Sequence, residues 1–117
     1  MGTRGFEELR VYQLAEQLAD RIWEMVQSWP NLARDTLGKQ IIRSADSIGA
    51  NIAEGSGRKT TKDFKHFLAM AYGSSLELET QILLSRQFKF GNVQKIAQTE
   101  AMLMEVQKML FKMKHDS

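Results

Sequence analysis

The sequence predicts an all-α protein, an antiparallel up-down-up-down four-helix bundle. Long segments with apolar residues at helical spacing alternate with connections of about four to seven residues. No segment shows the apolar alternation of a β-strand. Short connections between helices favour antiparallel neighbours. The 117 residues, 43% of them hydrophobic and 26% charged, have the size and balance of one domain covering residues 1–117.

The first two predicted helices cover residues 7–28 and 35–55. The first carries an apolar stripe made of Val11, Ala15, Leu18, Ile22 and Met25. The second carries a matching stripe made of Leu37, Ile41, Ala45, Ile48 and Ile52. Pro30 ends the first helix because proline cannot continue one. Asp35 or Thr36 is the expected N-cap of the second, since short polar side chains accept hydrogen bonds from free backbone amides.

The third and fourth predicted helices cover residues 61–89 and 92–114. Thr60 begins the third, with Asp63 three residues on, and Asn92 is the expected cap of the fourth. The inner face of the third is made of Phe64, Phe67, Ala71, Ser74, Leu78 and Ile82. The inner face of the fourth is made of Ile96, Leu103, Val106, Leu110 and Met113. The side chains expected at the centre of the core are Ile22, Ile41, Ile48, Ile52, Leu78, Ile82 and Leu103.

A row of polar side chains lies beside the apolar stripe of the second helix and faces polar residues of the third. Its members are Arg43, Ser47, Asn51 and Glu54 from the second helix and Ser74 and Glu77 from the third. An unpaired buried polar group costs about 1–3 kcal/mol, so a row that touches the core must be hydrogen-bonded. The expected ion pair joins Arg43 to Glu54 or Glu77. We interpret the row as a structural network that fixes helix register or seals a subunit boundary, the alternative being a ligand or catalytic site.

Residues of the kinds that form most enzyme and metal sites are scarce. There is no cysteine, and His66 and His115 have no neighbouring ligands at the spacing that zinc requires. Glu77 and Glu79 point about 200° apart around a helix, so they cannot share a substrate. Residues 55–60 are glycine-rich but lack the glycine spacing and the preceding strand of a phosphate-binding loop. We therefore expect no enzymatic activity, no metal site and no cofactor.

The charge of the whole chain is small, but its distribution is uneven. Lysine and arginine number 16 against 14 acidic residues, a net charge of +2 that indicates no polyanion partner by itself. Residues 34–66, however, hold seven basic and four acidic side chains. The first ten residues contain two glutamates where a signal peptide needs an apolar core, and no stretch reaches the roughly 18 apolar residues of a membrane span. We expect a cytoplasmic protein with no membrane partner.

Basic residues concentrate where the second predicted helix gives way to the third. Arg58, Lys59, Lys62 and Lys65 fall within eight residues, opposed by Asp63. Lys62 and Lys65 are three residues apart and share a helix face, while the other two cations lie on the preceding loop. We interpret this cluster as a nucleic-acid contact that reads phosphates and not bases. The alternative is that these residues solubilise the end of a helix.

The first predicted helix has more apolar surface than one inward stripe uses. Tyr12, Ala19 and Trp23 recur at steps of seven and four, beside the core stripe. Large aromatic side chains left exposed usually mark an interface. We therefore predict that these three residues belong to a self-association surface. The alternative is a wide core that takes in both stripes.

Several motifs together give the chain a family resemblance. They are Phe6-Glu7-Glu8-Leu9-Arg10-Val11-Tyr12-Gln13, Gln40-Ile41-Ile42-Arg43, Ser47-Ile48-Gly49-Ala50-Asn51-Ile52-Ala53-Glu54-Gly55, Gly57-Arg58, Phe64, Phe67-Leu68, Ala71-Tyr72-Gly73-Ser74 and Glu77-Leu78-Glu79. The combination spans nearly the whole chain. It resembles the bacterial four-helix-bundle proteins encoded in intervening sequences of large-subunit ribosomal RNA genes.

The resemblance implies a bundle without known enzymatic activity, assembled as a homopentameric barrel. The same superfamily includes the accessory variability determinant of diversity-generating retroelements, which binds nucleic acid and a reverse transcriptase. Expected partners are therefore copies of the chain itself, RNA or DNA, and a reverse transcriptase or another protein. The retroelement proteins are more basic than this chain of net charge +2, so nucleic-acid binding should be weak. Two function classes stay open: an oligomeric scaffold that binds RNA or DNA through local basic patches, and a structural or protein-interaction module with no nucleic-acid role.

Overall fold

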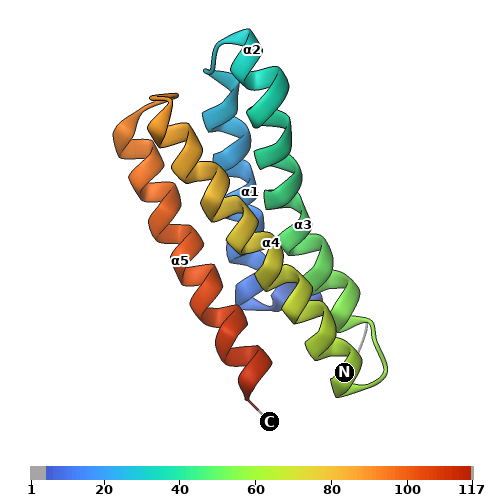
Figure 1. Ribbon diagram of the computed structural model, residues 1–117. Helices are drawn as coiled ribbons and strands as arrows, with labels where there is room; N and C mark the ends of the chain where they lie inside the picture. Colours follow the sequence, from blue (N-terminus) through green and yellow to red (C-terminus); the bar gives the residue numbers. More distant parts are fainter. Residues whose placement is uncertain (1–4, 117) are drawn as a thin grey trace.

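Long helices run alternately up and down in the computed structural model, which describes residues 5–116 (Figure 1). The elements in chain order are η1 (Phe6–Glu8), α1 (Arg10–Gln27), α2 (Asn31–Ala33), η2 (Arg34–Gly38), α3 (Lys39–Ser56), α4 (Thr61–Gln87) and α5 (Val93–His115). The described residues contain no strand. The predicted all-α four-helix bundle is thus confirmed, while residues 1–4 and 117 of the predicted domain lie outside the described part of the chain.

The helices form a closed square in cross-section. Helix α1 packs against α3 and α5, and α4 packs against the same two helices from the other side. The α1–α3 seam and the α4–α5 seam are therefore on opposite sides of the bundle. The bundle is elongated, with extents of 44 × 21 × 20 Å. None of the helices in the described range is long and apolar enough to cross a membrane.

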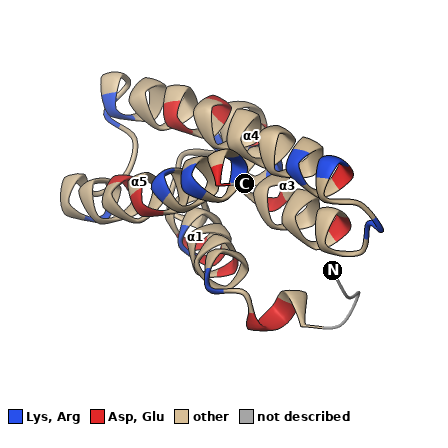
Figure 2. Ribbon diagram, turned by 90° about the horizontal axis from the view of Figure 1, so that it is seen from below, with Lys and Arg blue, Asp and Glu red and all other residues tan. Residues whose placement is uncertain are grey.

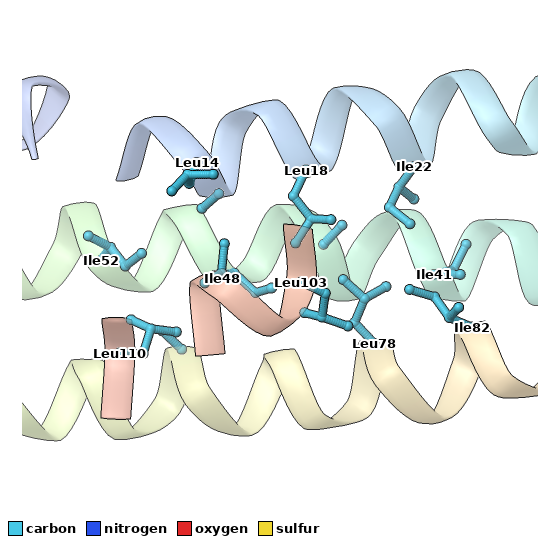
Figure 3. Close-up of a cluster of buried hydrophobic side chains, with 14 of the residues drawn as sticks. Leu14, Leu18, Ile22, Ile41, Ile48, Ile52, Leu78, Ile82, Leu103 and Leu110 are labelled. Atoms are coloured by element: carbon cyan, nitrogen blue, oxygen red, sulfur yellow. The ribbon is translucent and has the colours of Figure 1, made fainter. Parts of the chain in front are cut away.

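Most of the buried core side chains are ones that the helical spacing predicted. The core also contains Leu14, Val26, Trp29, Ala33 and Leu68, which were not predicted, while the predicted inner-face residues Leu37, Phe67, Ser74 and Met113 are only half-buried. Six of the seven expected central residues are completely buried and Leu103 is 2% exposed. Figure 3 shows aliphatic side chains from all four long helices meeting along the bundle axis. The apolar stripes of the sequence therefore account for most of the interior of the fold.

The first and second helices differ from prediction at their starts. The first begins at Arg10 and not at residue 7, because residues 6–8 form a separate 3-10 turn and Leu9 is extended. The second begins at Asn31, directly after Pro30, and continues through the π-helical segment η2 into α3. Proline ends one helix and is also well tolerated at the start of the next.

The predicted N-cap of the second helix is wrong. Asp35 and Thr36 lie inside the helical run, and the Thr36 hydroxyl donates to the carbonyl of Leu32 at 2.7 Å. Gly38 ends this π-helical segment pressed against α1, since a Cβ built on it would lie 2.7 Å from Cγ1 of Val26.

The N-caps predicted for the last two helices are confirmed. The hydroxyl oxygen of Thr60 accepts from the amide of Asp63 at 3.1 Å, and the side-chain oxygen of Asn92 accepts from the amide of Lys95 at 3.0 Å. Both bonds satisfy amides that have no partner within their own helix. The Thr60 cap places the start of α4 next to the basic loop that precedes it.

Candidate functional site

Arg58 is held against the bundle at the end of α3. Its guanidinium pairs with the Glu54 carboxylate at 2.7 Å and lies 4.7 Å from the ring centre of Phe67 on α4. Both partners of the ion pair are largely exposed, so the pair contributes little to stability. Its effect is positional, because it directs the Arg58 side chain along the start of α4.

The lysines of the predicted cluster lie beside Arg58 on the same end of the bundle. Lys59 and Lys62 are exposed and Lys65 is half-buried. None of the three forms an ion pair within the described part of the chain. The loop and the first turns of α4 therefore present free ammonium groups to solvent.

Further lysines reach this end from α5. Helices α4 and α5 are antiparallel neighbours, and the rings of Tyr72 and Phe111 are 6.1 Å apart, so the end of α5 lies beside the fourth turn of α4 and points towards the end of the bundle where α4 begins. Lys112 and Lys114 occupy that last turn. Figure 2 shows basic segments at the α3–α4 loop, the start of α4 and the end of α5. These two lysines are not among the predicted site residues; their density in one turn, combined with antiparallel helix pairing, is the sequence signal that points to them.

Half of the predicted polar row forms one hydrogen-bonded cluster between α3 and α4. The hydroxyls of Ser47 and Ser74 are 2.8 Å apart, and the amide nitrogen of Asn51 donates to the carbonyl and the hydroxyl of Ser47 at 2.9 and 3.2 Å. These bonds set the register of α3 against α4, because a shift by one turn would break the contact between the serines.

The other members of the row have different partners from those predicted. Glu77 accepts a hydrogen bond from Ser44 at 2.9 Å, and Glu54 forms an ion pair with Arg58. Arg43 is exposed and lines the surface between α1 and α3 instead. The predicted pairing of Arg43 with either carboxylate is wrong, because Arg43 points outward from α3 while Glu77 bonds Ser44 and Glu54 pairs with Arg58. Ser44, which the sequence analysis missed, precedes Ser47 by three residues on the α4-facing side.

The predicted self-association stripe divides into a buried part and an exposed part. Tyr12 and Ala19 are half-buried and pack against the core. Tyr12 closes over Gly49 of α3, whose Cβ position would lie 3.5 Å from the tyrosine ring, and meets the Phe6 ring edge-on at 5.0 Å. Trp23 is 56% exposed. Within the stripe, Trp23 alone offers a large free surface to another molecule.

The phenol of Tyr12 is hydrogen-bonded to the carboxylate of Glu16 on α1. A side-chain hydrogen bond with Glu16 raises the pKa of Tyr12 to about 12, with further contributions from burial and from the negative charges of Glu16 and Glu7. The neutral phenol is the form that fits the seam between α1 and α3. The described residues contain no group of three or more histidine, cysteine, aspartate or glutamate side chains that could hold a metal ion.

Comparisons with known proteins match the fold. A crystal structure of a protein of unknown function from the S23 ribosomal protein family of Bacteroides thetaiotaomicron VPI-5482 superposes with a TM-score of 0.82. The two sequences are 24% identical, and the match covers 91% of this chain and 99% of the other. No match was found among curated protein sequences. Residues 7–112 match the 23S rRNA-intervening sequence protein family. Since that match spans nearly the whole chain, the protein belongs to the 23S rRNA-intervening sequence protein family.

Proposed function

We propose that this protein is a non-enzymatic helical bundle that assembles with copies of itself and binds RNA or DNA weakly and without sequence specificity. The observation that carries the proposal is the gathering of cations from separate segments at one end of the bundle. This basic end consists of Arg58, Lys59, Lys62, Lys65, Lys112 and Lys114.

The basic end has a local surplus of positive charge that the net charge of the chain conceals. The acidic residues closest in sequence to these six cations are Glu54, Asp63 and Asp116, and Glu54 is already engaged by Arg58. Lysines on short exposed turns suit phosphates, which they contact as mobile point charges. Lys112 and Lys114 also offset the partial negative charge at the C-terminal end of the α5 helix dipole.

The geometry favours phosphate contacts over base recognition. Phe64 is buried, Phe67 is half-buried beneath the Arg58 guanidinium, and Phe111, which is 54% exposed, packs on His115 with ring centres 4.2 Å apart, so each ring already has a partner. The α3–α4 loop is too short to enter a groove of a nucleic-acid duplex and place a helix against the base edges. Binding should therefore tolerate many sequences and depend steeply on salt.

Self-association would bring several copies of the basic end together and so form a larger continuous surface of positive charge. A few phosphate contacts per copy give weak binding, while several copies in one assembly contact one nucleic acid at high effective concentration. The exposed Trp23 supports such an assembly, since large exposed aromatics usually mark interfaces. Five subunits are preferred because of the family resemblance described above.

The test replaces Arg58, Lys59, Lys62 and Lys65 with glutamine and titrates labelled RNA and DNA at about 50 and 200 mM salt. Wild-type affinity should fall by orders of magnitude between the two salt concentrations, and the variant should bind much more weakly at the lower one. A control variant removes four cations elsewhere, at Arg21, Lys89, Lys95 and Lys108, and should retain most of the binding.

Two results would overturn the proposal. One is a wild-type protein that does not bind at the lower salt concentration. The other is equal loss in both variants, which would reflect total charge and not the basic end. In either case the structural or protein-interaction role becomes the better account.

A further inference from the structure

Exposed apolar side chains gather at the end of the bundle opposite the basic end. Figure 1 shows helix α2 and the connection from α4 to α5 together at this end, with the α3–α4 loop at the other. The two most exposed large apolar side chains of the described residues lie here, Leu32 at 77% and Val93 at 71%, together with Phe88 at 56%. They belong to three separate helix ends, those of α2, α5 and α4, and are here called the apolar tip.

The apolar tip rests on packed aromatic rings. Trp29 is 3% exposed, and its ring centre lies 5.3 Å from that of Phe90. Phe90, which is half-buried, lies in turn 5.8 Å from Phe88. The three rings thus lead outward from the core, and Phe88 is the most exposed of them. The exposure of Phe88 is therefore maintained by the packing beneath it.

Two hollows lie between the side chains of this end. One, of about 390 Å³, is lined by residues of α2, η2 and the end of α4, among them Leu32 and Phe88. The other, of about 410 Å³, lies at the start of α5 and is lined by residues that include Val93. Phe90 lines both hollows and so stands between them. A rigid helix of a protein partner would fill one hollow and leave the other open, whereas fluid lipid chains can fill both.

The charge beside the apolar tip is positive. Residues 84–98, which end α4 and begin α5, contain Arg86, Lys89 and Lys95 and no acidic residue. Arg86 pairs with Glu100, while Lys89 and Lys95 are exposed and form no ion pair within the part of the chain that the structure describes. A lysine can lay its methylene groups on apolar surface and keep its ammonium group in a polar layer. Free ammonium groups beside exposed apolar side chains complement an anionic bilayer, where headgroup phosphates lie directly above acyl chains.

We propose that the apolar tip docks on the surface of an anionic lipid bilayer, with its three side chains among the upper acyl chains and Lys89 and Lys95 at the headgroup phosphates. The contact uses the end of the bundle opposite the proposed nucleic-acid contact, so the two proposals are independent. The expectation of no membrane partner rested on the lack of a membrane-spanning segment, and attachment to a bilayer surface needs none. The short extents of the bundle are 21 and 20 Å, so one chain covers little membrane and binds weakly and reversibly.

The first experiment measures how much protein sediments with vesicles of phosphatidylcholine alone or of equal parts of phosphatidylcholine and phosphatidylglycerol. The wild type should sediment with the mixed vesicles and much less with the neutral ones. The triple variant Leu32→Ser, Phe88→Ser and Val93→Ser should partition about tenfold more weakly or less, because it removes the inserted apolar surface. Lys89→Gln and Lys95→Gln should each weaken partition about fivefold.

Matched controls change the same kinds of side chain elsewhere on the molecule. Leu76→Ser, Leu83→Ser and Met104→Ser together remove exposed apolar side chains from the sides of the bundle. Lys62→Gln and Lys65→Gln remove two lysines of the basic end. Both control proteins should keep most of the wild-type partition. Circular dichroism of the tip variant should match the wild type because all of its substituted side chains are more than half exposed, and the lysine variants test the contact without changing any apolar side chain.

Three results would overturn the inference. The first is a wild type that does not sediment with the mixed vesicles, which would leave the apolar tip to a protein partner. The second is equal loss of partition in the tip variant and in the apolar control. The third is a smaller mass of the tip variant than of the wild type in light scattering without vesicles, which would show that the tip joins copies of the chain.

An RNA titration distinguishes failure of this inference from failure of the proposed function. The tip variant should bind RNA as the wild type does, because the basic end is unchanged. Loss of RNA binding together with vesicle binding in the tip variant would contradict the assignment of separate roles to the two ends of the bundle.

Discussion

The same substitution at two helical glycines should have opposite effects on stability. Gly55 ends the apolar face of α3 where that helix comes closest to α4, and a Cβ built there would lie 2.7 Å from Cβ of Phe67 and 3.3 Å from a ring carbon of Phe64. Gly73 lies in the middle of α4, and a Cβ built there would have no atom of another element within 4 Å. Replacing each with alanine therefore separates steric cost from helix propensity.

The expected magnitudes follow from these surroundings. Alanine in a helix interior is favoured over glycine by about 0.5–1 kcal/mol, so Gly73→Ala should raise the free energy of unfolding by that amount. Gly55→Ala gains less from propensity, because Gly55 lies one residue from the end of α3, and it forces Cβ against Cβ of Phe67, which no side-chain rotation relieves. Overpacking of this kind costs about 1–3 kcal/mol. The difference between the two variants therefore combines the steric cost at Gly55 with the smaller propensity gain of a position at the end of a helix.

Equilibrium urea unfolding at one fixed protein concentration is the appropriate assay. Gly55→Ala should be less stable than Gly73→Ala by about 1–3 kcal/mol and less stable than the wild type. Equal stabilisation of both variants would refute the close approach of α3 and α4 at Gly55. That approach also places Arg58 over Phe67, so the assay tests the packing that positions the basic end.

Two further predictions concern the core and the α1–α3 seam. Ile48→Ala should lower the free energy of unfolding by about 2–5 kcal/mol, since the side chain is completely buried; a loss below about 0.5 kcal/mol would show that it does not fill the core. The pKa of Tyr12 rises from 10.0 to about 12 on folding, so the neutral phenol is favoured in the folded state. The neutral Tyr12 phenol therefore stabilises the folded state below pH 10.0, and this contribution is lost as pH rises towards 12. The free energy of unfolding, measured at increasing pH, should show this decline in the wild type, and Tyr12→Phe should reduce the decline.

The apolar periodicity predicted the core because the residues that share one face of a helix are determined by their spacing in the sequence alone. Ile41, Ile48 and Ile52 share a face in any straight helix, and that face must be buried somewhere. The caps at Thr60 and Asn92 were predictable for the same reason, since each bond reaches only three residues ahead.

Long-range pairings could not be predicted in this way. The partner of Arg43 depends on which side of α3 meets α4, and that follows from how the helices pack and not from the spacing within one helix. The second helix begins earlier than predicted because Pro30 precedes its first residue, Asn31, as its N-cap, a role that proline fills as readily as it ends a helix. Lys112 and Lys114 belong to the basic end because α5 runs antiparallel to α4, so that the last turn of α5 lies at the end of the bundle where α4 begins.

The most direct test of the proposed function is the slope of log affinity for single-stranded RNA against log salt concentration. Each phosphate neutralised by a lysine or arginine contributes about 0.7 to the magnitude of that slope. The account predicts a steep negative slope for the wild type and a clearly shallower one after Arg58, Lys59, Lys62 and Lys65 are changed to glutamine. Identical slopes for the two proteins would contradict the assignment of the basic end as the nucleic-acid contact.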